Sequence, residues 1–567
     1  MVLCRLLDAE AVRQITLHTD AYDSRFEERL SSVVEISTRP EGAVERHGSS
    51  EVGIAGVGGS MTRPWGEGGS LFISGRQSVL HLLTNDNGMN GVPKYRNAFA
   101  RAEKRRGPDS WWGISLTGID AISMHPSATD SEETSAFDVA YSGWRNTTGV
   151  NWQHVFSARS YGVASVANAE QTQTIAETGQ LQGDALVYRE RTLDGMTTVK
   201  YDWTLAVGKR LTLTTGARGA VDRMDYAVEQ PMGLANPYSE DPAPLDATGL
   251  GRRFAAVSAA GYGQAEIGLG RGARLVVGGR GMQWALGGRA GMTGKALVSA
   301  PVLGRMAHVG YAEYEQMAPT LYLLSFDNVK RLGPIRSRQV TGGVDLVNSR
   351  RVRVTLEGYE KRYANYPVAV DHPEVSLANV ADTFGQAFLM FPMTGKGTGV
   401  ARGVELSAVS HLSSRLNVTA TLVYARSWYA GLDGVLRRAN YDLPVSANVT
   451  GVWSVGRGTT LSWRYSAASG KPYTPDNLAL SAAQNRDVYD LTRVNGLRSR
   501  AYERLDFRLE HERKVVRGIM MWHVGLQNAL NRKNFYSQTW EPRMAGGGVA
   551  EQDQMPLFPD GGVRFRF

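Results

Sequence analysis

Polar and apolar residues alternate with a period of two along much of the chain. Between residues 415 and 424 the odd positions are mainly Arg, Asn and Thr, whereas the even positions are Leu, Val, Ala, Leu and Tyr. The pattern recurs at Arg504, Asp506, Arg508 and Glu510, which are separated by Leu or Phe. Successive side chains of a strand point to opposite faces, so this alternation predicts strands with one wet and one apolar face.

The alternating segments number about 20–22 after residue 48, and the clearest ones come in adjacent pairs. Within a pair the connection is only one to three residues long, whereas the gaps between pairs are long. The pairs are 337–347 with 351–362, 401–411 with 413–427, 443–455 with 458–468, and 501–513 with 516–528. The intervening gaps are 363–400, 428–442, 469–500 and 529–560.

Short turns at one end and long loops at the other are typical of an outer-membrane barrel. Strands of about 10 tilted residues also match the thickness of the hydrocarbon layer. A β-propeller would repeat every 40–50 residues or so with similar loops, and a parallel β-helix would show shorter, more regular coils. Neither pattern is present. The sequence therefore predicts an all-β protein, a large transmembrane antiparallel β-barrel of about 22 strands.

Aromatic residues lie near the ends of several apolar faces, namely Tyr424, Trp453, Trp463 and Trp522. In a barrel we expect these residues to form girdles at the two membrane interfaces. The chain closes on an alternating segment with Phe565 and the terminal Phe567 on its apolar side. This ending resembles the C-terminal signal that outer-membrane barrels present to the barrel assembly machinery.

Composition excludes several other classes of protein. The single Cys among 567 residues cannot form an internal disulfide, and 42% apolar residues are too many for a disordered chain. The net charge of +8 is spread without a block of like charges, so we expect no nucleic-acid partner. No apolar run reaches 18 residues, which excludes transmembrane helices.

Catalytic and cofactor motifs are absent as well. The ten His form no HExxH pair, and neither GxxxxGK[ST] nor GxSxG occurs in the sequence. We therefore expect no enzymatic activity, no metal site and no cofactor.

Several stretches resemble a family, the TonB-dependent outer-membrane receptors. The resemblance lies in residues 12–42 (VRQITLHTDAYDSRFEERLSSVVEISTRPEG), 318–334 (APTLYLLSFDNVKRLGP), 355–367 (TLEGYEKRYANYP), 470–475 (GKPYTP), 502–536 (with RLDFRLEH and LQNALNRKNFY) and the terminal GGVRFRF. The first stretch resembles the end of the family's plug domain. The others resemble barrel strands and loops in the family's order.

The resemblance implies an outer-membrane transporter, embedded in lipid, for a scarce small-molecule or oligomeric solute such as a siderophore or a carbohydrate. Residues 1–45 would be a C-terminal remnant of the plug and residues 46–567 the barrel. Because only the end of the plug is recognisable and no secretory signal precedes it, we expect an N-terminally truncated form of a Gram-negative receptor. In the full-length form, a TonB-type periplasmic energiser would act on the plug. The alternatives are a passive channel without a plug and a soluble β-rich binding or carbohydrate-active protein.

The resemblance implies that the outer loops and the plug apex capture the ligand. Aromatic side chains suit sugars, chelates and peptides alike. The candidate ligand-contacting loop aromatics are Tyr238, Tyr366, Phe384, Tyr473, Tyr489, Tyr536 and Trp540. In the plug-like segment we expect Arg29 and Glu35 to contact the barrel wall. The charged residues 504–510 are expected to pair with one another in a wet interior.

Overall fold

The computed structural model describes most of the chain. The described residues are 9–19, 21–26, 28–38, 46–84, 91–125, 137–180, 183–231, 236–243, 250–380, 391–541, 544 and 548–567. Of the predicted site residues, Phe384 falls outside these ranges.

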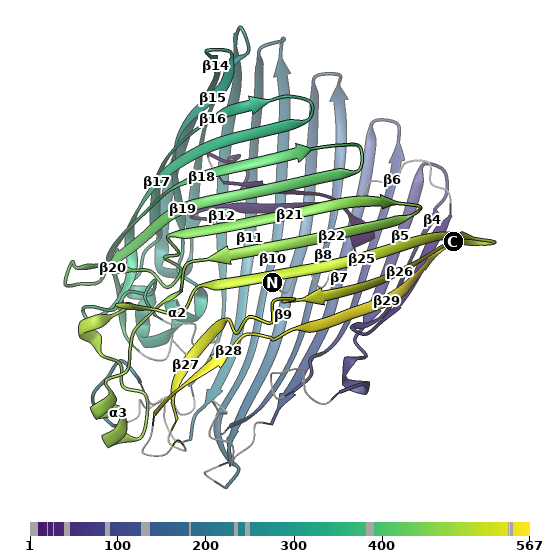
Figure 1. Cartoon of the computed structure of the whole chain (residues 1–567). Coiled ribbons are helices and arrows are strands. Elements are labelled where there is room, and N and C mark those ends of the chain that lie inside the picture. The colour runs from purple at the N-terminus through teal and green to yellow at the C-terminus, as the bar shows by residue number, and fades with distance from the viewer. Residues whose placement is uncertain are drawn as a thin grey trace.

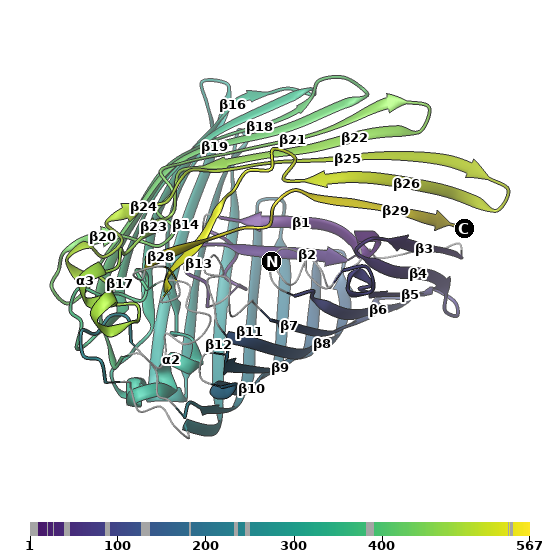
Figure 2. The same cartoon turned by 60° about the horizontal axis from the view of Figure 1, so that its bottom comes forward.

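Twenty-two long strands form the wall of one closed antiparallel barrel, as the alternation predicts (Figures 1 and 2). The first eleven are β3 (His47–Gly53), β4 (Gly56–Pro64), β5 (Gly69–Gln77), β6 (Lys94–Arg106), β7 (Asp109–Met124), β8 (Phe137–Ser157), β9 (Ser160–Gly179), β10 (Ala185–Val207), β11 (Leu211–Glu229), β12 (Leu250–Gly270) and β13 (Ala273–Trp284). The other eleven are β14 (Arg289–Val302), β15 (Arg305–Gln316), β16 (Ile335–Asn348), β17 (Val352–Ala369), β18 (Met393–His411), β19 (Leu416–Ala430), β21 (Val445–Gly456), β22 (Thr459–Ala468), β25 (Tyr502–Val515), β26 (Gly518–Gln527) and β29 (Phe558–Arg566).

The barrel closes where the last strand, β29, pairs with the first wall strand, β3. The register runs from Gly562 opposite Gly53 to Arg566 opposite Ser49. Backbone hydrogen bonds continue the pairing to the chain end, because Phe567 and Gly48 exchange N–H···O=C bonds in both directions. Closure satisfies every wall strand along both edges, which a membrane interior requires of a sheet. Among the described residues, no helix is long and apolar enough to cross a membrane.

The two rims of the barrel differ as predicted. Neighbouring strands are joined at one rim by short turns, such as residues 516–517, and we call this end the turn rim. The other end, the loop rim, includes long connections such as 469–501 and 528–557. Figure 1 shows the turn rim at the upper right and the small helices and short strands of the loop rim at the lower left.

The loop rim holds the remaining small elements. They are η2 (Leu80–Leu82), η4 (Leu286–Gly288), α2 (Thr320–Leu324), η5 (Ser325–Lys330), β20 (Leu436–Arg438), β23 (Pro472–Tyr473), α3 (Leu478–Gln484), η7 (Leu491–Arg493), β24 (Leu497–Arg498), β27 (Phe535–Glu541) and β28 (Gly548–Asp553).

Two details of the strand prediction are wrong. Strands are not uniformly about 10 residues long, since β10 has 23 residues and β8 and β12 have 21 each. A strand longer than the membrane is thick continues into water, where the outward face turns polar and the alternation no longer marks its end. Trp463 does not lie at a rim either: it sits in the middle of β22 with its ring over Gly451, where a Cβ would come within 2.1 Å of the ring.

Trp522 holds the same position in β26 as Trp463 in β22, the fifth of ten residues. The other two girdle residues lie nearer to a strand end: Tyr424 is opposite Val445, the first residue of β21 at the loop rim, and Trp453 lies a few residues before the end of β21 at the turn rim. Outward apolar side chains such as Leu422 and Tyr424 are half exposed, as expected for a surface that faces lipid.

A short N-terminal segment precedes the wall and lies inside the barrel. It consists of η1 (Ala9–Ala11), β1 (Val12–His18) and β2 (Val33–Thr38), and the two strands pair only with each other. Figure 2 shows β1 and β2 enclosed by the wall strands. We refer to described residues 9–38 as the inner segment.

Candidate functional site

The inner segment is held to the barrel wall mainly through its own backbone. Lys295 of β14 donates from Nζ to the carbonyl oxygens of Ala21 (3.0 Å) and Tyr22 (2.5 Å), and Arg280 of β13 donates to the carbonyl of Ser24 (3.1 Å). Both wall side chains are buried. Charged donors on carbonyl oxygens make strong hydrogen bonds. The wall thus fixes the path of residues 21–24 largely independently of the side chains they carry.

A second group of contacts fixes the other end of the same loop. Gln339 of β16 donates to the carbonyl of Leu30, and Lys361 of β17 donates to Ser31 through both Oγ (2.9 Å) and the carbonyl (3.3 Å). These hydrogen bonds tie the loop between β1 and β2 to four wall strands, β13, β14, β16 and β17.

Side-chain packing completes this docking. The ring of Tyr22 stacks on Tyr314 of β15, with ring centroids 4.2 Å apart. Gly278 of β13 is needed at the contact, because a Cβ there would come within 2.4 Å of Ser24 Oγ. The absence of a side chain on the wall gives the inner segment room to approach.

Arg29 and Glu35, the predicted plug–barrel contacts, make their described hydrogen bonds within the inner segment. Glu35 lies 3.1 Å from His18 Nε2 on the neighbouring strand, a diagonal contact in a register that pairs Glu35 with Thr16. Arg29 donates to the carbonyl of Glu28 (2.6 Å). The hydrogen bonds to charged wall residues are made by backbone carbonyl groups of the inner segment rather than by Arg29 or Glu35.

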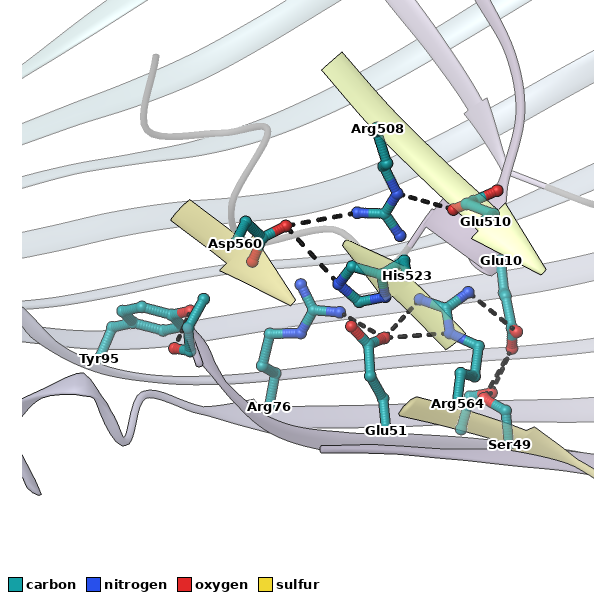
Figure 3. A network of polar contacts seen from close by, with 12 residues as sticks. Glu10, Ser49, Glu51, Arg76, Tyr95, Arg508, Glu510, His523, Asp560 and Arg564 are labelled. Carbon is teal, nitrogen blue, oxygen red and sulfur yellow. Dashed lines mark hydrogen bonds and ion pairs between the residues drawn. The ribbon is translucent and has the colours of Figure 1, made fainter. Parts of the chain in front are cut away.

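The start of the inner segment joins the closure of the barrel. Glu10 Oε2 accepts hydrogen bonds from Ser49 Oγ of β3 (3.0 Å) and Ser60 Oγ of β4 (2.5 Å). Arg564 of β29 lies 3.6 Å from Glu10 Oε1 and donates to Glu51 of β3 through Nε at 3.0 Å. Figure 3 shows these residues as one network across the seam between the last and first wall strands.

The same network extends along the last strands. Asp560 of β29 lies 3.6 Å from both His523 of β26 and Arg508 of β25, and Arg508 donates to Glu510 at 2.7 Å (Figure 3). Arg504 likewise donates to Asp506 at 2.7 Å. The expected pairing of residues 504–510 is confirmed, with partners two positions apart on the same strand rather than across strands.

Beyond the seam, Ala11 packs against a small apolar cluster on the inner wall. The cluster consists of Phe72 of β5, Phe99 of β6 and Leu116 of β7, all of them buried. Residues 10 and 11 therefore contact both sides of the closure, the last strand through Glu10 and the first strands through both residues.

At the loop rim, the predicted aromatic residues fall into separate groups rather than one pocket. Tyr238 is buried, at 2% exposure, and makes edge contacts with Phe391 and Tyr489 at 5.5 and 5.1 Å. Tyr473 stacks on Phe535 of β27, with ring centroids 5.9 Å apart.

The remaining candidates lie apart from these two groups. Tyr366 packs on Tyr363 and Tyr429 at the end of β17 and β19. Trp540 is buried, whereas Tyr536 is 41% exposed. Much of this aromatic surface packs loops together, and Tyr536 is the most accessible of the described candidates.

Two acidic residues at the loop rim were not predicted. Asp476 is 5% exposed and lies beside Asp487, which accepts hydrogen bonds from Trp540 N (2.6 Å) and Thr539 Oγ1 (2.9 Å). Burial and the neighbouring Asp487 raise the pKa of Asp476 to about 7. Burial also raises the pKa of Asp487.

Potential metal ligands are scattered over the described part of the chain. No group of three or more His, Cys, Asp or Glu there is placed to hold a metal ion. A cavity of about 340 Å³ lies near the turn rim, lined by residues that include Arg274, His308 and Arg353.

Comparison with known proteins shows which solved structures share this architecture. No protein-family model matches the sequence, and no curated protein matches it. Solved structures do match: the ferric-catecholate import receptor Fiu of Escherichia coli K12 superposes with a TM-score of 0.71 at 11% identity, over 98% of this chain and 87% of that one. The matched structures are TonB-dependent outer-membrane receptors. The chain has the TonB-dependent receptor fold.

Two further receptors support the assignment of the fold. The siderophore receptor PiuA of Acinetobacter baumannii has a TM-score of 0.68 at 12% identity, over 98% of this chain and 86% of that one. The ferric enterobactin receptor PfeA of Pseudomonas aeruginosa, solved as a mutant, has a TM-score of 0.68 at 14% identity, over 99% and 86%. At these identities the likeness establishes the receptor fold, and it extends over nearly the whole chain.

The wall residues that hold the inner segment escaped sequence reasoning for a physical reason. Lys295 and Arg280 lie in Gly-rich strands, and many other wet strand faces carry Lys or Arg as well. The available signal was their position on the inward face of predicted strands. Their partners are carbonyl groups, however, which leave no trace in the sequence.

Proposed function

We propose that this protein is an outer-membrane TonB-dependent receptor that takes up a scarce solute, with residues 1–45 as the plug remnant and residues 46–567 as the barrel. The observation that carries the proposal is the inner segment, whose loop at residues 21–31 is bonded to four wall strands inside a closed 22-strand barrel. A segment fixed inside the lumen serves a gated receptor, and a simple pore has no need of one.

The two rims suggest the direction of transport. In outer-membrane barrels the short turns face the periplasm and the long loops face the outside. The loop rim of this chain would then meet the solute first, and the inner segment would lie between the solute and the periplasm. A TonB-type energiser would act on the plug from the periplasmic side.

The remaining partners follow from the same assignment. The outward apolar face would contact outer-membrane lipid. The C-terminal strand with Phe565 and Phe567 would be the part that the barrel assembly machinery engages. We propose no nucleic-acid partner and no catalytic role.

The solute class is proposed from two sources. The solved structures that match include receptors for ferric catecholates and ferric enterobactin, a siderophore receptor and the copper transporter OprC. Among the predicted candidates of this chain, Tyr536 is the most exposed described residue and Tyr473 is partly exposed, so these two could meet a solute at the loop rim. We propose that the solute is a metal chelate or a molecule of similar size.

A binding panel on the purified chain in detergent micelles tests this proposal. The probes are a ferric catecholate, ferric enterobactin, ferric alcaligin, Cu²⁺ and a short oligosaccharide, each titrated while the intrinsic Trp fluorescence is recorded. We expect one probe class to bind saturably and Tyr536→Ser to weaken that binding. Tyr424→Ser, on the lipid face, is the matched control and should leave it unchanged.

The alternative of a passive channel is less favoured, because the inner segment is bonded to the wall and the matched structures are receptors and transporters. It would replace our proposal if no probe bound and if the barrel conducted ions steadily in planar bilayers.

A further inference from the structure

The pair Asp476 and Asp487 lies where three segments of the loop rim meet. Asp476 follows β23, and Asp487 lies beyond α3, so the two residues stand near the two ends of the α3 loop, residues 475–490. Two backbone hydrogen bonds join the ends of this loop: Asn477 N donates to Val488 O (2.7 Å), and Asp490 N donates to Pro475 O (2.9 Å).

From this loop, Asp487 reaches β27. Its two carboxylate oxygens accept from Trp540 N and Thr539 Oγ1, at 2.6 and 2.9 Å. Trp540 itself is buried. The Asp487 carboxyl is therefore a principal link between the α3 loop and β27.

The neighbouring Arg486 links the α3 loop to residues 236–241, in the connection between β11 and β12. Its guanidinium donates to the carbonyl oxygens of Asn236, Ser239 and Asp241, at 2.9–3.0 Å. Tyr489 N also donates to Pro237 O at 2.7 Å. Three outer segments are thus joined around residues 486–489, and we call this junction the outer clasp.

Asp476 has an unusual environment inside the clasp. Within the described part of the chain, no other residue's N–H or O–H donates to either of its carboxylate oxygens, and its side-chain neighbour is the carboxyl of Asp487. Two ionised carboxylates in contact, one of them enclosed, repel each other and lack the solvent that would stabilise them. A single proton removes the conflict, because a protonated Asp476 can donate to Asp487.

We infer that Asp476 and Asp487 share a proton that holds the outer clasp closed, and that loss of this proton loosens the α3 loop from β27 and so opens the loop rim. The charge that develops on Asp476 repels the Asp487 carboxylate, which strains the hydrogen bonds that Asp487 accepts from Trp540 N and Thr539 Oγ1. Loosening would free the α3 loop, which carries Tyr489 at one end and follows Tyr473 at the other. The inference concerns the outer loops alone and does not require the proposed transport function.

The other charged and titratable groups around the pair are few. Arg486 faces Asp487 and offsets part of its charge, while Asp241 faces Arg486 in turn. Tyr473 and Tyr489 also lie near Asp476, and burial raises the pKa of both phenols, so they stay neutral.

The direction of the pH effect follows from the raised pKa. Burial and Asp487 raise the pKa of Asp476 from 3.8 to about 7 in the closed clasp. The closed state therefore binds the proton more tightly than the open one, and its advantage is complete below pH 3.8 and is lost as the pH rises to about 7. Within that window each pH unit should raise the opening constant about tenfold.

Hydrogen exchange of the full chain in detergent micelles tests the inference. Amides of residues 475–490 are followed at pH 5.5 and pH 8.0, with rates corrected for intrinsic exchange. The opening constant should be about 30-fold larger at pH 8.0, which is roughly 1.5 pH units of the window. Asp476→Asn can donate to Asp487 at any pH, so this variant should keep the low-pH protection at pH 8.0.

Asp490→Asn is the matched control. Asp490 lies in the same loop but is partly exposed and bonded to Thr492 and Arg493, so its variant should keep the pH dependence of the parent chain. The shift of the folded band on an unheated gel shows that each variant has folded.

Three results would overturn the inference. The first is equal protection of the parent chain at both pH values, and the second is a pH dependence that survives in Asp476→Asn. The third is protection that Ca²⁺ restores at pH 8.0 and that EDTA removes at pH 5.5, which would make the pair a cation site.

Discussion

Replacing Lys295 by Met removes the wall cation most deeply involved in docking the inner segment. Lys295 is 9% exposed, and its ammonium donates to the carbonyl oxygens of both Ala21 and Tyr22. Met fills a similar volume but donates nothing. The two carbonyls would then lack these donors in a place that water reaches poorly.

The size of the effect follows from these two bonds. A hydrogen bond to a charged group contributes about 1.5–3 kcal/mol. Removing the ammonium also relieves its burial cost, which offsets part of the sum. We expect a net loss of about 2–4 kcal/mol in the free energy that docks residues 21–31, or about a 30- to 900-fold increase in their local opening constant.

Hydrogen exchange of the folded chain measures this opening directly, because fragments that cover residues 21–31 can be compared with fragments of the wall. Lys200→Met is the matched control. Lys200 is also a charged residue of the barrel wall, but its described contacts are with Asp202 at 3.0 Å and the ring of Tyr262. Unchanged exchange of residues 21–31 in Lys295→Met would refute the view that wall cations hold the inner segment.

Two further predictions concern the closure of the barrel. The first is a double-mutant cycle with Glu10→Gln and Arg564→Gln, measured by the urea midpoint of unfolding. The two changes should couple by roughly 0.5–3 kcal/mol, because Glu10 links the inner segment to the seam. Additive effects on the free energy of unfolding would mean that Glu10 does not act at the closure. Gly48→Val should lower the temperature at which the folded gel band is lost, at a cost of about 1–3 kcal/mol, because a Cβ at Gly48 would come within 2.7 Å of the Phe567 ring. Gly219→Val is its control, since a Cβ at Gly219 meets nothing within 4 Å. An equal loss in both variants would point to strand propensity rather than the seam.

The wall of the barrel was predictable because a membrane barrel repeats one simple constraint. Every wall strand has one face toward lipid, so each strand segment shows polar and apolar residues alternating with a period of two. A turn as short as 516–517 also leaves little freedom in how two strands join. Strand ends were harder to place. At the end of β17, for example, Tyr366 and Val368 still pair with β18, although the alternation predicts a strand that ends near residue 362.

The contacts of the site were less accessible to sequence reasoning. Lys295 and Lys361 bind backbone oxygens of the inner segment, and a backbone oxygen is the same in every residue. Asp476 and Asp487 are eleven positions apart and meet only because the α3 loop closes on itself. Aromatic residues were found readily, but composition does not distinguish a residue such as Tyr238, which packs loops together, from the exposed Tyr536.

The central claim is that this chain is an outer-membrane barrel whose loop rim faces outward, and cysteine labelling in whole cells tests it most directly. In a Cys4→Ser background, Ala482→Cys places a thiol on the exposed side of α3, and Val516→Cys places one at the turn rim, where Val516 is fully exposed. A maleimide too large and charged to cross the outer membrane is added before or after lysis. We predict that Ala482→Cys is labelled in intact cells and that Val516→Cys is labelled only after lysis. Labelling of Val516→Cys but not Ala482→Cys in intact cells, or recovery of the chain in the soluble fraction, would contradict the account.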